Sequence, residues 1–175
     1  MSQKAVEESP MRAIRVGKVV VNIGVGKSGE AIERGKKVLE QVTGQKPCQT
    51  RAKRSVRDFG IHEGEPIGVV VTARGSTTAD LVKKLLEARD RKLAESCFDK
   101  RGSVSFGIKE HIEIPGIRYD PAIGILGMNV SILLERPGYR VARRSRRRSK
   151  VGKAHFVSKE DAMEYFRKNF GATIA

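Results

Sequence analysis

The chain has few aromatic residues. It lacks tryptophan, and phenylalanine and tyrosine together make up 5% of its 175 residues. Proteins that bind single-stranded nucleic acid without sequence preference use aromatic side chains as platforms on which successive bases stack. The composition therefore argues against that class of binder. If nucleic acid is the ligand, the composition favours a protein that recognises phosphates and the shape of folded RNA.

Cysteine is also scarce. Cys48 and Cys97 are the only two, and their separation excludes a zinc site of the C-x-x-C kind. Residues 1–17 contain no apolar signal-peptide core, so we expect a cytoplasmic protein without a disulfide. Both cysteines are interpreted as small packing residues, and no metal site is expected.

Long apolar runs are missing as well. No run approaches the roughly 18 residues of a membrane-spanning helix, and no basic amphipathic helix carries bulky apolar anchors. A membrane role is therefore not expected. A hydrophobic content of 39% over 175 residues is enough for one domain with a proper core plus basic extensions. We predict a single RNA-binding domain over residues 1–175.

Positive charge is abundant. The chain has 35 Lys and Arg against 20 Asp and Glu, a formal net charge of +15. Basic residues gather at 46–57, at 83–92 and most densely at 140–153, which contains no acid. The cations of this last run are Arg140, Arg143, Arg144, Arg146, Arg147, Arg148, Lys150 and Lys153.

Such a run repels itself and gains binding free energy by neutralising phosphates and releasing their counterions. Arginine predominates, and its planar fork contacts phosphate in a bidentate way that lysine cannot match. The alternative is a solvated basic tail. Nucleic acid is the leading partner, and we expect the run to need a polyanion to hold it still.

The hydrophobic pattern predicts an α+β fold. Strands are expected near 14–23, 67–71, 102–114 and 128–134, and helices over 31–42, 77–93 and about 158–170. Thr77 is the expected cap of the second helix, and Ser158 with Asp161 that of the third. We predict a mainly antiparallel sheet with helices packed on one face, plus basic loops and extensions.

The turn Gly24–Gly29 superficially resembles a phosphate-binding loop. A Walker-type loop would need a glycine where Val21 stands, whereas the letters of a dinucleotide fingerprint, G-x-G-x-x-G, are matched. A nucleotide-binding enzyme therefore stays open as an alternative. It is disfavoured because the later strands are expected to be antiparallel. The same turn can instead present backbone N–H groups to an RNA phosphate.

No catalytic constellation is apparent. His62, His111 and His155 are scattered, and none is near a cysteine or serine in a nucleophile pattern. On the predicted strand, Glu110 would share a face with Ile112, and His111 would share the other with Glu113, which makes at best a pH-sensitive pair. We expect neither an enzyme nor a cofactor.

Five sequence motifs follow one another along the chain. They are VVVNIGVG at 19–26, LEQVTGQKPCQTRAKRSV at 39–56, FGIHEGEPIG at 59–68, FGIKEHI at 106–112 and YDP at 119–121. Together they resemble the family of ribosomal protein five of the large subunit, which binds 5S rRNA. RPGY at 136–139, the arginine-rich run and SKEDAM at 158–163 resemble its archaeal and eukaryotic branch. The likeness spans about residues 10–170. Cys48 replaces a usual aliphatic residue, and Ser103 a usual asparagine.

The resemblance implies a structural protein of the ribosome, in the cytoplasm. It would bind 5S rRNA and 23S rRNA in the central protuberance, beside neighbouring ribosomal proteins, and reach the P-site tRNA. The positions carried over to 5S rRNA are Asn22, Gly24, Gly26, Lys27, Thr43, Gln45, Lys46, Thr50 and Lys53. Those carried over to tRNA are Arg54, Ser55, Arg57 and Asp58. The basic run would contact other rRNA phosphates. A free-standing binder of structured RNA is the second alternative.

Overall fold

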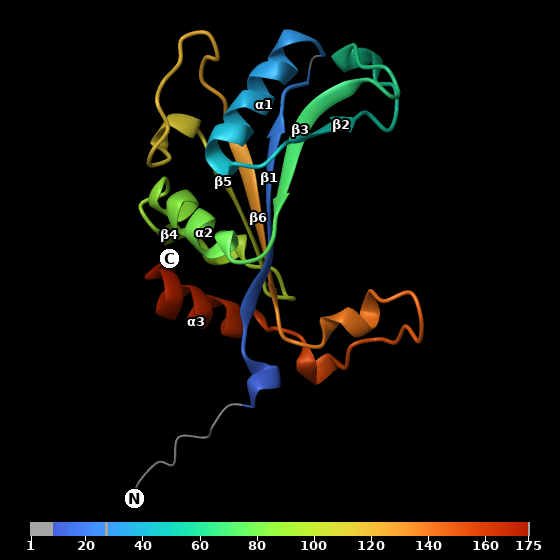
Figure 1. The fold of residues 1–175 in the computed structure, drawn as a ribbon, viewed down its shortest axis with the longest axis vertical. Coiled ribbons are helices and arrows are strands. Elements are labelled where there is room, and N and C mark those ends of the chain that lie inside the picture. Colours follow the sequence, from blue (N-terminus) through green and yellow to red (C-terminus); the bar gives the residue numbers. More distant parts are fainter. Residues whose placement is uncertain (1–8, 27, 175) are drawn as a thin grey trace, which may run out of the picture.

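The computed structural model describes residues 9–26 and 28–174. Its main element is a five-stranded sheet in the order β2-β3-β1-β6-β5, in which each neighbouring pair is antiparallel (Figure 1). The strands are β1 (Arg15–Gly24), β2 (Cys48–Arg51), β3 (Pro66–Ala73), β5 (Ser103–Ile108) and β6 (Met128–Glu135). The prediction of an α+β fold with a mainly antiparallel sheet is confirmed.

Alternation along the strands places one face of the sheet in the core. Val19, Val21 and Ile23 of β1 are almost fully buried. In register with Val21 lie Val71 of β3 and Val130 of β6, which are buried too. Branched apolar side chains suit this pleated, packed surface. The buried face therefore runs continuously across the sheet.

Three helices supply the other half of the core. They are α1 (Glu30–Thr43), α2 (Thr77–Glu87) and α3 (Lys159–Phe170). Their apolar stripes join the buried sheet face in one cluster, so the helices pack on one side of the sheet as predicted. Gly35 lets α1 approach β3 closely, because a Cβ there would lie 3.0 Å from Val69 Cγ2.

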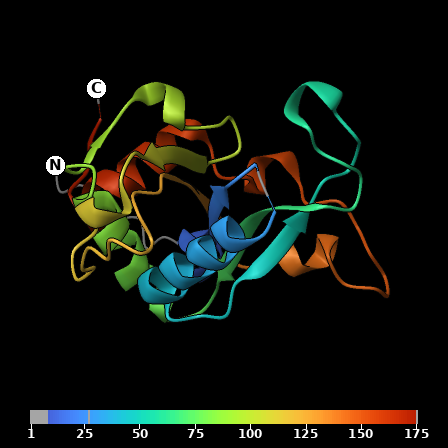
Figure 2. The ribbon, with the colours of Figure 1, turned by 90° about the horizontal axis from the view of Figure 1, so that it is seen from above.

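The third helix is held by aromatic packing and by the C-terminal strand. Phe166 lies edge-on to Phe98, with ring centroids 5.8 Å apart, and also contacts Phe170. After Gly171, which ends the helix with φ 61°, β7 (Thr173–Ile174) pairs in parallel with β4 (Lys92–Leu93). The chain thus returns to the end of α2 (Figures 1 and 2).

Two predicted elements are shorter than expected. The strand predicted over 102–114 ends at Ile108, and residues His111–Glu113 form a 3-10 turn, so the strand faces assigned to Glu110 and Glu113 are wrong. The cause is His111, whose side chain is buried and whose N–H donates to the Leu126 carbonyl.

The helix predicted over 77–93 ends at Glu87, and Leu93 belongs to β4. Thr77 is its first residue rather than its cap, and the preceding Ser76 makes no capping hydrogen bond. The interpretation of Cys48 as a packing residue is also wrong, because it lies exposed on the edge strand β2. Cys97 is half-buried against the core, as expected.

Capping of α3 provides a test of the fold. Ser158 Oγ accepts the Asp161 N–H at 3.1 Å, and the Asp161 side chain accepts the Ser158 N–H at 3.2 Å. We expect Ser158→Ala to lower the free energy of unfolding by about 1 kcal/mol, measured by urea denaturation. Thr77→Ala, at the start of α2, is the matched control and should change it little. Equal losses from both substitutions would contradict the capping role.

Candidate nucleic-acid interface

The face of the sheet opposite the helices carries mostly small and polar side chains, together with the half-buried Val20, Val70 and Leu133. We call it the open face. Asn22 of β1 lies in register with Asn129 of β6, and Ser105 Oγ donates to Ser131 Oγ at 3.1 Å. Most residues on this face are exposed or half-buried, between the buried positions of each strand, whereas Gly68 and Glu135 are buried. Asn129, Ser105 and Ser131 were missed from the sequence, although alternation along β6 and β5 placed them opposite the apolar residues of those strands.

Some predicted contact residues meet on one part of the open face. Gly24, Gly68 and Thr50 are in register across β1, β3 and β2, beside Asn22. A Cβ on Gly68 would lie 2.8 Å from Thr50 Oγ1, so only glycine leaves room for this threonine. The result is a shallow surface with a hydroxyl, an amide and exposed backbone.

The glycine turn after β1 is engaged within the protein. The N–H groups of Val25 and Gly26 both donate to the Ile67 carbonyl, at 3.0 and 2.9 Å. Glu30 and Glu33 occupy the first turn of α1, and their charge opposes an anion at that helix end. The two strands paired with β1, β3 and β6, are both antiparallel to it. The turn is therefore not part of a dinucleotide-binding βαβ unit, which needs parallel strands. The N–H groups of Val25 and Gly26 are therefore already used within the protein, and RNA contact by the other residues of the turn stays a prediction. Lys27 lies outside the described residues.

Thr43, Gln45 and Lys46 lie at the opposite end of α1 from that turn. Helix α1 has 14 residues, which separates its ends by about 20 Å. Thr43 Oγ1 donates to the Leu39 carbonyl at 2.6 Å and accepts the Gln45 N–H at 3.3 Å. Its hydroxyl helps to end the helix, and Gly44 completes the end with φ 64°. Thr43, Gln45 and Lys46 therefore lie about one helix length from the glycine turn, and β2 connects them to Thr50.

Residues 52–65 project from the end of β2 and β3 as a closed loop. Val56 and Ile61 exchange backbone hydrogen bonds of 2.9 and 3.1 Å, and Ser55 Oγ accepts the Glu63 N–H at 2.9 Å. Ser55 thus orders the loop. The side chains of Lys53, Arg54, Arg57 and Asp58 are exposed.

Phe59 at the tip of this loop was missed as a candidate. It is 76% exposed, the largest value among the exposed large hydrophobic residues of the described chain. The available signal was its position: it stands in a polar loop with no strand or helix periodicity to bury it. An exposed ring beside two arginines is suited to contact with nucleic acid.

Glu65 links this loop to the glycine turn. Ser28 Oγ donates to one of its carboxylate oxygens at 2.6 Å, and the His62 N–H donates to the other at 3.1 Å. The Ser28 hydroxyl, followed by the His62 N–H, holds the pKa of Glu65 below its ordinary value. The two connections that flank the upper end of the open face are thereby fixed to each other.

The basic run lies in an extended segment over residues 137–157, which we call the basic segment. Its ends are tied by Tyr139, whose hydroxyl donates to the His155 carbonyl at 3.2 Å and accepts the Val157 N–H at 3.1 Å. His155 Nε2 lies 2.7 Å from the Pro137 carbonyl oxygen. These contacts join the two ends of the segment to each other, and the need of residues 140–153 for a polyanion stays a prediction.

Two of its arginines are already engaged. Arg143 pairs with Glu135, which is only 5% exposed, at 2.5 Å. Arg144 Nε donates to the Arg147 carbonyl at 2.8 Å. Within the described part of the chain, the other cations have no acidic partner within 4.0 Å. They are Arg140, Arg146, Arg147, Arg148, Lys150 and Lys153, all exposed.

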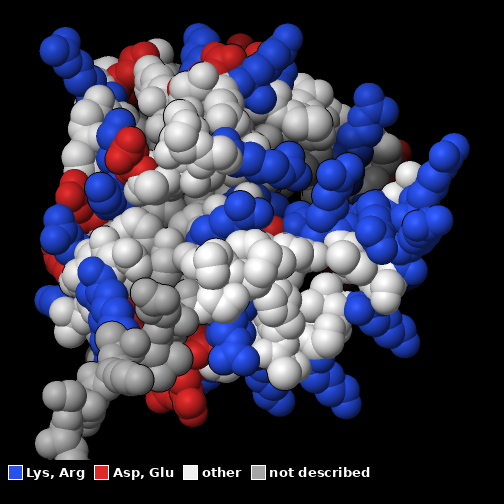
Figure 3. Space-filling model, turned by 60° about the horizontal axis from the view of Figure 1, so that its bottom comes forward, with Lys and Arg blue, Asp and Glu red and all other residues white. Residues whose placement is uncertain are grey.

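The basic segment and the loop 52–65 project on the same side of the molecule, away from α2 and α3 (Figures 1 and 2). Figure 3 shows a dense group of Lys and Arg side chains at the right, on the side where the basic segment lies in Figure 1. Two cationic projections therefore flank one side of the molecule. The arrangement is that of an anion-binding surface.

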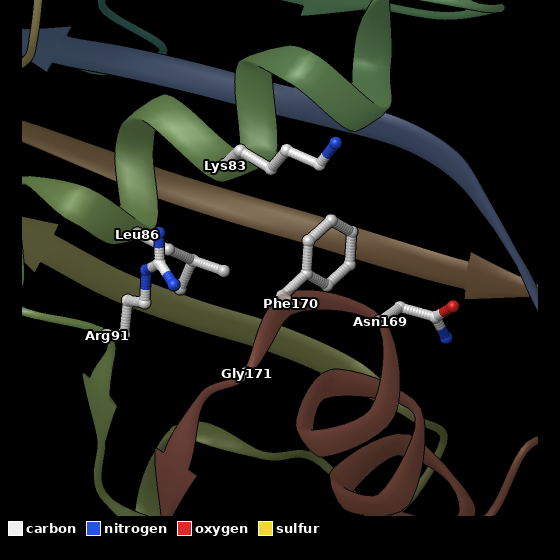
Figure 4. Close-up of a pocket in the computed structure, with 6 residues that line it drawn as sticks. All are labelled: Lys83, Leu86, Arg91, Asn169, Phe170 and Gly171. Atoms are coloured by element: carbon white, nitrogen blue, oxygen red, sulfur yellow. The ribbon is translucent and has the colours of Figure 1, made fainter.

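The cleft between α2 and α3 has a different character (Figure 4). Its cations are paired: Arg91 contacts Glu87 at 2.9 Å, and Lys83 lies 3.9 Å from Asp80. The described residues contain no cluster of three metal-ligating side chains and no helix long and apolar enough to cross a membrane.

The chain is similar to known proteins over nearly its whole length. The family model for ribosomal protein L5 matches residues 9–62, and a second model, for the C-terminus of the same ribosomal family, matches 66–165. Three relatives are each called large ribosomal subunit protein uL5. That of Nitrosopumilus maritimus is 49% identical, over 96% of this chain and 97% of its own. Those of Sulfurisphaera tokodaii and Pyrobaculum aerophilum are 52% and 50% identical, over 95% and 97% of this chain and 94% of their own.

The bond between Ser28 and Glu65 generates a pH prediction. Because folding lowers the pKa of Glu65, its contribution to stability is present above the ordinary pKa and is lost as the pH falls through the lowered value. We expect Ser28→Ala to move the pKa of Glu65 upward, toward the ordinary value, in an NMR titration of the carboxyl carbon. Ser76→Ala is the control and should leave it in place. An unmoved Glu65 pKa in the Ser28 variant would contradict the link.

Proposed function

The chain belongs to the ribosomal protein L5 family and is therefore a constituent of the large ribosomal subunit in the cytoplasm; from this premise we propose that it holds 5S rRNA in the central protuberance. The observation that carries this proposal is the open face, a hydrogen-bonding surface next to two cationic projections. The whole chain acts as a single RNA-binding domain.

Recognition is assigned to the neutral side chains of the open face. Asn22, Thr50 and Asn129 carry amide and hydroxyl groups that can bond ribose hydroxyls and base edges. They sit on paired strands, so their spacing is set by backbone hydrogen bonds rather than by flexible loops. Gln45, Lys46 and Lys53 would then contact the backbone of the same RNA beyond the sheet.

The basic segment is assigned to 23S rRNA. Its six free cations are exposed and can neutralise phosphates without disturbing the Arg143–Glu135 pair. Phosphate contacts position an RNA but carry no sequence information directly. This segment therefore adds affinity, and neighbouring ribosomal proteins complete its surroundings in the subunit.

The loop 52–65 is assigned to the P-site tRNA. It projects beyond the sheet, its tip carries Arg57 and the exposed ring of Phe59, and its base is fixed by Glu65. A long, internally bonded loop is suited to reach a second RNA while the sheet holds the first. The proposed role is structural, since the family's relatives are ribosomal proteins rather than enzymes.

The assignment of 5S rRNA is tested by competition with an unrelated structured RNA of equal length, at several salt concentrations. We expect a preference for 5S rRNA that persists as salt rises. Asn22→Ala should reduce the preference about three- to tenfold, the worth of one or two hydrogen bonds, with the salt slope unchanged. Asn169→Ala, whose side chain bonds its own helix at the Tyr165 carbonyl, is the matched control. Equal affinities that fall together with salt would refute the assignment.

The tRNA contact is tested in ribosomes that carry variant protein. Arg57→Ala combined with Phe59→Ala removes a cation and a stacking surface from the loop tip. We expect tRNA binding in the P site to weaken about fivefold or more, with 5S rRNA affinity of the isolated protein unchanged. Arg167→Ala on exposed α3 should have no effect. Normal P-site binding by the double variant would place the contact elsewhere.

A further inference from the structure

The basic segment and the open face enclose a cleft that the functions above leave unused. We propose that it receives the base of one unstacked RNA nucleotide, with the flanking phosphates on its cationic rim. The proposal rests on the proposed RNA binding and adds a base-binding site to it. The cleft has a volume of about 740 Å³. This lies within the range of about 300–1,000 Å³ typical of small-molecule and cofactor sites.

The floor of the cleft is apolar. Leu133 of β6 contributes from the open face, and Ala142, Val151 and Phe156 contribute from the basic segment. Each of these four is only half-buried, which leaves apolar surface exposed to water in an otherwise highly charged region. A nucleobase would cover this surface and gain the free energy of its burial.

Phe156 already takes part in a stack. The Arg101 guanidinium carbon lies 5.4 Å from the centre of the Phe156 ring. A guanidinium plane over an aromatic ring is a surface on which bases stack, by the same cation–π attraction. Arg101 comes from the connection before β5, so sheet and basic segment both contribute to this pair.

The walls are held in place before any ligand arrives. The Tyr139 ring lies edge-on to Phe156, with centroids 5.9 Å apart. Its hydroxyl bonds His155 and Val157 on either side of that phenylalanine. The Arg143–Glu135 pair fixes the opposite wall to the end of β6. A site ordered in this way loses little conformational entropy on binding.

The rim is positively charged. Lys18, Arg101, Lys150 and Lys153 line the cleft, as does the Arg143–Glu135 pair, in which the two charges compensate. Asp99 is the remaining acid of the lining, and one of its oxygens accepts the Lys100 N–H at 2.8 Å. Four cations against one carboxylate complement the phosphates on both sides of a nucleotide.

An apolar floor with a cationic rim selects an unpaired nucleotide among nucleic-acid ligands. In a duplex the bases are stacked and cannot enter, whereas loops and bulges present bases that can turn outward. A purely electrostatic site would not need the apolar floor, and an acidic peptide would not need the arginine–aromatic stack. One cleft of this kind also agrees with the low aromatic content, which argues only against a series of stacking platforms.

The test compares three polyanions of similar length on the full-length protein: hexa-adenylate, the same hexamer without bases, and hexaglutamate. We expect hexa-adenylate to bind about fivefold or more tightly than the abasic hexamer, at the lower end of what one base–aromatic stack contributes. Phe156→Leu should remove that difference and leave the affinity for the abasic hexamer unchanged. Phe156→Tyr should restore it, and thermal melting checks that each variant is folded.

Tyr119→Leu is the matched control, because it alters an exposed aromatic ring that does not line the cleft and should keep the difference. Equal binding of the hexamers with and without bases would overturn the proposal, as would hexaglutamate binding as tightly as hexa-adenylate. So would a base-dependent difference that survives Phe156→Leu. The competition with 5S rRNA is read separately with wild-type protein, so failure of this cleft is distinguishable from failure of the proposed function.

Discussion

The alternation of buried and more exposed side chains along antiparallel strands is the constraint on which the rest of the structure depends. Burial of Val19, Val21 and Ile23 against the helices fixes the register of β1, and a slip of one residue would bring Asn22 into the core. Because all three helices are used on one side, the other side is left without a helix over its polar residues. The candidate interface is a consequence of how the core is packed.

Charge is placed on this scaffold by a few buried or ordered groups. Glu135 is nearly inaccessible, so its pairing with Arg143 ties the first part of the basic segment to the end of β6. The Tyr139 hydroxyl joins the two ends of the segment, because it donates one hydrogen bond to His155 and accepts another from Val157. The remaining arginines repel one another, but the hydrogen bonds of Tyr139 keep the two ends of the segment together. Such a loop presents its cations in a fixed arrangement, which lowers the entropy lost when phosphates bind.

The periodicity of the sequence correctly predicted features that depend on residues close together in the chain. It failed for features that depend on contacts with residues far away in the chain. The helical spacing of core positions in α1 and the Ser158–Asp161 cap are local, and both are present. The end of β5 is set by Leu126, fifteen residues beyond His111, and no pattern in 102–114 contains that information. In the same way, Ile67 accepts the N–H groups of Val25 and Gly26, so two donors of a turn that matches a fingerprint by letters are used within the protein. Asn22 lies on a strand as the pattern predicted, whereas the strand β2 that carries Thr50 was not predicted.

Affinity and specificity are divided between different parts of the surface. The two projections carry cations, and their contribution to RNA binding must fall as salt rises, whichever RNA is present. The open face carries neutral donors and acceptors around Asn22 and Thr50, whose contribution depends on the arrangement of ribose and bases and changes little with salt. A protein with a net charge of +15 would bind any RNA if the projections acted alone. In the proposed function the neutral face would therefore make one RNA preferable to another, and its position on strands whose other side is buried would limit which RNA shapes fit.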